Sequence, residues 1–146
     1  MMTDTADRLR ILRAIRKCLA DGEEYFQKAM DILDEIGKGS IGVGMTPLVG
    51  GYAIKDPKSH YRGALIEIDS AERALEPLIT RFRDGRVNES HFKSKDAIVL
   101  LGDLAGVDYN YIVRKLADQS GRESTWYRLK ELRAKIEQLL GLIADA

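Results

Sequence analysis

The stretch LKELRAKIEQLLGLI, residues 129–143, repeats apolar side chains at alternating intervals of three and four residues. This interval is the a/d pattern of a helix that buries one stripe of its surface against another helix. Two heptads are fewer than the three or four that define a coiled coil. We therefore predict a C-terminal helix that packs against a helix of the same chain or of a second copy. Its apolar stripe, called the C-terminal seam below, consists of Leu129, Leu132, Ile136, Leu139 and Ile143.

The same periodicity predicts helices over the N-terminal half. From about residue 3 to 36 it indicates one long helix or two in tandem, and in the second case Asp21-Gly22 would be the break. A second helix is expected over residues 61–82. Because proline lacks an amide hydrogen, Pro77 should kink or interrupt that helix.

A glycine-rich segment, residues 37–60, is expected to connect these helices as a loop. Gly37 to Gly42 satisfy the G-x-G-x-x-G spacing of a dinucleotide-binding turn. Such a turn follows a strand and opens a helix, whereas Gly37 follows a predicted helix. We therefore expect no nucleotide binding. The apolar residues in this segment favour a small hairpin or a segment that a partner orders.

Composition narrows the classes of function. The 146 residues are the length of one domain, and 23 lysines and arginines balance 23 aspartates and glutamates, so no overall field attracts nucleic acid or an anionic membrane. Residues 81–135 are locally basic. One cysteine permits no internal disulfide, and neither a signal peptide nor an apolar run of about 18 residues is present. We expect a cytoplasmic protein that does not enter a membrane.

Patterns of catalytic or metal-binding residues are absent from the sequence. Neither His60 nor His91 follows a glutamate by three positions, as the ligands of a di-metal bundle would. Glu72 and Glu76 are typical of a solvated helix face, and Cys18 is typical of a core position. We expect no enzyme activity, no cofactor and no metal.

Residues 101–116, LGDLAGVDYNYIVRKL, carry a more specific pattern. Gly102 would let two helices cross closely, and Gly106 would allow a left-handed turn. Val107 would fill the space between the helices, and Asp108 would cap the second one. A further helix is therefore expected from residue 97, with Ser94 and Asp96 as its caps, and a second from residue 108.

This pattern resembles the helix-turn-helix of DNA-binding repressors, most closely the lactose-operon type. Glycine stands at 102 where alanine is usual, and Val113 replaces a small polar residue. With the second helix burying Ile112 and Leu116, the resemblance implies outward side chains that reach double-stranded DNA. These are Tyr109, Asn110 and Arg114, with Lys115 beside them for a phosphate.

Two alternatives to this assignment, the first helix-turn-helix register, remain open. Residues 117–132, ADQSGRESTWYRLKEL, also resemble a recognition unit. In this second register, residues 108–118 would form the supporting helix, and Arg122, Thr125 and Arg128 would contact DNA. In the other alternative, residues 97–118 form one continuous bundle helix with Gly102 and Gly106 on a packing face.

The fold class we predict is all-α, a helical bundle or long helical hairpin with a C-terminal half like a helix-turn-helix. Residues 1–83 would form the hairpin and residues 84–146 the basic region. Phage-encoded helix-turn-helix regulators are similar in plan, which implies a DNA-binding regulator or DNA-packaging factor. The alternative is a structural or adaptor protein that forms a homo-oligomer through its C-terminal helix.

Overall fold

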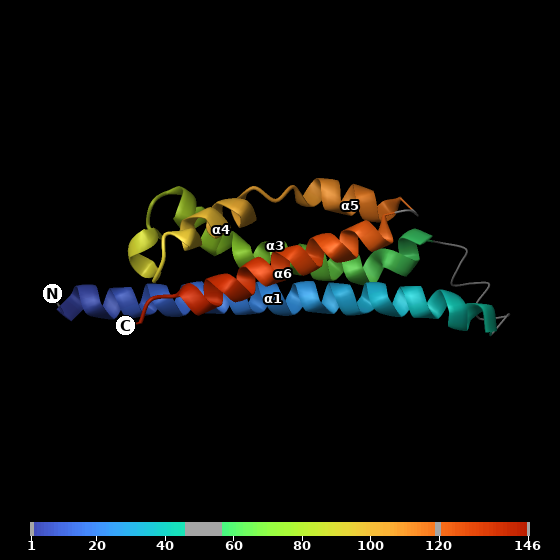
Figure 1. Cartoon of the computed structure of the whole chain (residues 1–146), viewed down its shortest axis with the longest axis horizontal. Helices are drawn as coiled ribbons and strands as arrows, with labels where there is room; N and C mark the ends of the chain where they lie inside the picture. Colours follow the sequence, from blue (N-terminus) through green and yellow to red (C-terminus); the bar gives the residue numbers. More distant parts are fainter. Residues whose placement is uncertain (1, 46–56, 119–120, 146) are drawn as a thin grey trace.

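One long helix runs the length of the molecule, and a second, shorter one lies antiparallel beside it (Figure 1). The computed structural model describes residues 2–45, 57–118 and 121–145. Helices α1 (Met2–Met45) and α3 (Pro57–Arg83) lie side by side, and α6 (Arg122–Leu142) packs against α1. The described residues form an all-α bundle, as predicted.

Two short helices lie on the side of the bundle opposite α1. These are α4 (Asp96–Ala105) and α5 (Tyr109–Ala117), which cover α3 and α6 (Figure 1). A 3₁₀ turn, η1 (Glu89–His91), precedes them. None of the described helices is long and apolar enough to span a bilayer.

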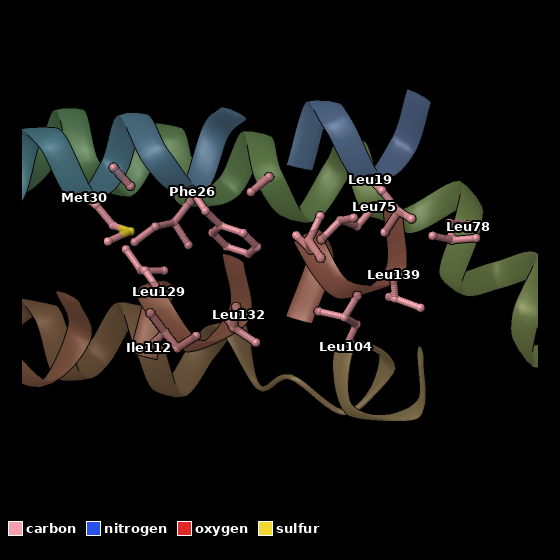
Figure 2. Close-up of a cluster of buried hydrophobic side chains, with 14 of the residues drawn as sticks. Leu19, Phe26, Met30, Leu75, Leu78, Leu104, Ile112, Leu129, Leu132 and Leu139 are labelled. Atoms are coloured by element: carbon pink, nitrogen blue, oxygen red, sulfur yellow. The ribbon is translucent and has the colours of Figure 1, made fainter. Parts of the chain in front are cut away.

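The C-terminal seam is buried within the chain. Each of its five side chains is at most 2% exposed. Figure 2 shows Leu129, Leu132 and Leu139 meeting apolar side chains from the other helices, including Phe26 of α1 and Leu104 of α4. The predicted packing against a helix of the same chain is therefore confirmed. The seam leaves no apolar stripe for a second copy, so it is no longer a reason to expect an oligomer.

The first helix is one continuous helix, as one of the two alternatives predicted, and it extends beyond residue 36. It continues through Gly22, where an added Cβ would lie 2.7 Å from the Leu75 side chain, so this glycine allows α1 and α3 to approach closely. Likewise, α3 includes Pro77. Glycine and proline weaken a helix, but tertiary packing can override their propensity.

The predicted loop over residues 37–60 is wrong at both ends. The backbone is helical to Met45 and again from Pro57, so the G-x-G-x-x-G spacing falls within α1. The predicted hairpin or partner-ordered segment lies mainly at residues 46–56, outside the described residues.

The beginning of α4 and the end of α6 are tied together. The Ser94 hydroxyl accepts a hydrogen bond from the amide of Asp96 at 3.1 Å, but the N-cap position is Lys95 and Asp96 is the first residue of α4, so the predicted caps are wrong. The amide of Lys93 donates to Leu142, and that of Ala144 donates to His91. These bonds fix α4 on α6 and thereby place α5, which follows it.

Candidate nucleic-acid interface

A three-residue turn separates α4 from α5. Residues 106–108 lie between the end of α4 at Ala105 and the start of α5 at Tyr109. Asp108 is extended, and its carboxylate accepts a hydrogen bond from the Tyr111 amide at 3.0 Å. The predicted N-cap is confirmed. The alternative of one continuous helix over residues 97–118 is wrong, because this cap begins a new helix.

The glycines of the turn do not act as expected. Gly106 has φ −88°, which any residue can adopt, so no left-handed conformation is required. Gly102 is exposed, and an added Cβ there would meet no atom within 4 Å. The expected close crossing at Gly102 is therefore wrong. Val107 is half-buried against the core, as expected for a residue between two helices.

The inner and outer faces of α5 agree with the sequence except at Tyr109. Ile112 and Leu116 are buried, whereas Asn110 and Arg114 are exposed. Lys115 is partly exposed, and Tyr111 is 57% exposed.

The outward orientation expected of Tyr109 is wrong. Its ring packs against the core, and it lines a hollow with Glu72 of α3. Burial, followed by the negative charge of Glu72, raises the pKa of its phenol, while Arg128 opposes this shift. Helical side chains tilt toward the N-terminus of their helix, so this first residue of α5 leans over α3.

The second register is only partly supported by the geometry. A helix does begin at Arg122, but Thr125 is 2% exposed, so it does not project outward to read a base edge as that register requires. Arg122 donates to the carbonyl of Leu33 at 3.4 Å. Arg128 is half-buried and pairs with Glu131 at 3.1 Å.

Residues of both registers meet in one groove of about 390 Å³ between α5 and α6. Lys115 comes from the first register and Arg128 from the second, so the two alternatives overlap in space. Thirteen positions separate them in the sequence, and no helical spacing connects them, so sequence reasoning missed this groove. The α5–α6 groove is lined by Gly106, Asp108, Tyr111, Ile112, Lys115, Ser124, Thr125 and Arg128.

In the part of the chain that the structure describes, the two cations of α5 are not held in ion pairs, although Asp118 lines a shallow hollow together with both of them. Within the described residues, neither Arg114 nor Lys115 takes part in an ion pair or a side-chain hydrogen bond. By contrast, Lys135 of α6 pairs with Asp103 at 2.9 Å. Of these two cations, Arg114 lies four residues after Asn110 and therefore on the same side of α5, whereas Lys115 lines the groove toward α6.

Other titratable groups do not form a second site. Among the described residues, no three histidine, cysteine or acidic side chains are grouped as metal ligands. His91 is buried, and its Nδ1 accepts a hydrogen bond from the Asn88 amide in a capping box. Cys18 packs against the core, where burial raises the pKa of its thiol above the ordinary value.

The candidate interface thus consists of Asn110 and Arg114 on the outside of α5, with Lys115 and Arg128 in the adjoining groove. Compared with known protein families, curated proteins and solved structures, the chain matches none of them.

Proposed function

We propose that this protein binds double-stranded DNA through the outer face of α5 and catalyses no reaction. The observation that carries the proposal is that Arg114 and Lys115, on a capped helix at the outside of the bundle, form no ion pair within the described residues (Figure 1). A short helix that projects polar side chains from a helix-turn-helix is suited to the major groove.

The side chains on this face match the chemistry of base edges. Asn110 and Arg114 are four residues apart and therefore lie on one side of α5. An asparagine amide can pair with adenine, and a guanidinium can donate two parallel hydrogen bonds to guanine. Lys115 would contact a phosphate and add affinity without sequence preference.

The balance of charge over the whole chain limits how strongly the protein can be attracted to DNA from a distance. With a formal net charge of zero, long-range attraction to DNA is weak, and binding depends on the local cations of α5. A regulator would discriminate between sequences through Asn110 and Arg114. A DNA-packaging factor would bind most duplexes alike through phosphate contacts.

Fluorescence anisotropy with mixed and selected duplexes at two salt concentrations tests the proposal. Arg114→Ala should lower affinity for a preferred duplex by about 1–3 kcal/mol and blur the preference at one base pair. Lys115→Ala should weaken binding to all duplexes alike. The matched control is Arg13→Ala, an exposed arginine of α1. Equal affinity of all three variants and the parent protein would contradict the proposal.

An adaptor protein that forms a homo-oligomer is the second candidate function. The favouring observation is a hollow of about 600 Å³ between α4 and α6, where Val99 is 65% exposed beside Leu142. Because the C-terminal seam is occupied, a second copy would need another apolar surface, and this hollow offers one. Sedimentation velocity over a range of concentrations tests this: Val99→Asp should abolish self-association, and a monomeric parent protein would reject it.

A further inference from the structure

One side chain of the α5–α6 groove lacks the hydrogen bond that its burial calls for. Thr125 is 2% exposed and lines the groove, but its Oγ1 has no hydrogen-bond partner within the described residues. Buried hydroxyl groups in native proteins nearly always have a partner. A ligand in the groove that accepts a hydrogen bond would supply one.

The cations of the groove flank this threonine. Arg128 lies one helical turn beyond Thr125 on α6, and Lys115 comes from α5 on the other side. Arg128 donates a single hydrogen bond, from one Nη to Glu131, so most of its five N–H groups are available. Lys115 has no ion pair within the described residues.

The beginning of α6 adds a third favourable feature. Among the described residues no side chain caps its first turn, and Ser124 and Thr125 place that turn at the groove. The N-terminus of a helix of 21 residues carries partial positive charge and free amide hydrogens, which favour an anion. The Asp108 carboxylate opposes an anion at the far side, although its Oδ1 is occupied by the Tyr111 amide.

We propose that the α5–α6 groove binds one phosphate group, with Lys115, Arg128 and the Thr125 hydroxyl as its ligands. A phosphate offers several acceptor oxygens to donors that converge from different sides. The groove also has room for more than an ion, and Tyr111 and Ile112 give it apolar walls that suit an attached sugar. We assign this phosphate to the backbone of the bound duplex, and this assignment rests on the DNA-binding function proposed above.

The test compares two substitutions of Thr125 in the full chain. Thr125→Val keeps the shape but removes the hydroxyl, whereas Thr125→Ser retains it. In the anisotropy assay, Thr125→Val should reduce duplex affinity about tenfold, because a hydrogen bond to a charged group is lost. Thr125→Ser should stay within about twofold of the parent protein. The melting temperature of Thr125→Val should not fall, since the lost hydroxyl has no partner in the free protein.

A second arm distinguishes backbone phosphate from free phosphate. Inorganic phosphate and a mononucleotide are titrated while the fluorescence of Trp126, the single tryptophan and the neighbour of Thr125, is followed. A saturable change that Thr125→Val abolishes, in a protein that binds no duplex, would support the phosphate site and overturn the DNA-binding function.

The remaining outcomes test whether DNA binding can stand without the phosphate site. If duplex binding depends on Arg114 but Thr125→Val, Lys115→Gln and Arg128→Gln all bind as the parent does, the phosphate site is overturned and DNA binding stands. If neither duplex nor phosphate binds at low salt, both proposals fail. Support requires that Lys115→Gln also lower the slope of log affinity against log salt by about one.

Discussion

Helices α5 and α6 lie next to each other but are held in the molecule in different ways. All five residues of the C-terminal seam are at most 2% exposed, so α6 is fixed along its whole length. By contrast, α5 has nine residues and buries only Ile112 and Leu116, while Tyr111 and Arg114 face solvent. Burial makes α6 part of the scaffold, whereas the limited burial of α5 leaves a face free for a partner.

The largest expected effect distinguishes these two helices by stability. Ile136→Ala in the seam should lower the free energy of unfolding by about 2–5 kcal/mol, because a fully buried side chain leaves a cavity. Val113→Ala on α5, where the side chain is 37% exposed, should change it by no more than about 0.5 kcal/mol. Urea unfolding followed by circular dichroism measures both. Equal effects would show that α5 is as integral to the fold as α6.

The next effect concerns the junction between the helices. An added Cβ at Gly121 would overlap the carbonyl oxygen of Lys115, an atom of the backbone that cannot rotate away. Gly121→Ala should therefore push the end of α5 away from α6 and destabilise the protein by about 1–3 kcal/mol.

Gly102 provides the matched control for this substitution. It lies in α4 with open space around it, so Gly102→Ala should be neutral or should stabilise the helix by up to about 1 kcal/mol. Thermal unfolding measures both variants. A Gly121→Ala protein as stable as the parent would mean that α5 and α6 can separate at no cost, and the groove would then lack fixed walls.

Sequence patterns predicted the features that depend on residues close to one another in the sequence. The seam follows from the three-and-four spacing, and the turn before α5 follows from Asp108, whose cap acts within its own helix. The partly buried position of Tyr109 depends instead on Glu72 and the rest of α3, which are distant in the sequence. A residue's place on its own helix is thus predictable, but the neighbour that covers it is not.

The glycines and the groove were missed for the same reason. Gly22 and Gly121 are needed where another element comes close, whereas Gly102 is not, and all three look alike in the sequence. The α5–α6 groove combines Lys115 and Arg128 from two registers that seemed mutually exclusive. Only the packing of α5 on α6 brings these cations together.

The smallest expected effect lies on the polar flank of α6 and concerns pH. Glu23 of α1 is partly buried, and its Oε2 has no hydrogen-bond partner among the described residues. Burial, followed by the proximity of Glu137, raises the pKa of the Glu23 carboxyl above 4.5, while Arg133 opposes the shift. The folded protein thus takes up a proton at Glu23 more readily than the unfolded chain does.

The sign of the resulting pH dependence follows from linkage. A raised carboxyl pKa means that the stability contribution of Glu23 is fully present below its unfolded pKa and is lost as pH rises through its folded pKa. Glu23→Gln, which mimics the neutral acid, should therefore stabilise the protein at pH 7, within about 1 kcal/mol because solvent screens a partly exposed group. This gain should disappear below pH 4.5, the ordinary carboxyl pKa.

Melting temperatures of the parent protein and of Glu23→Gln between pH 4.5 and pH 7 measure the effect, with Glu24→Gln on the exposed side of α1 as control. A Glu23→Gln protein that is less stable at pH 7 would show instead that the Glu23 carboxylate is held by Arg133, so that α6 relies on an ion pair in addition to its seam.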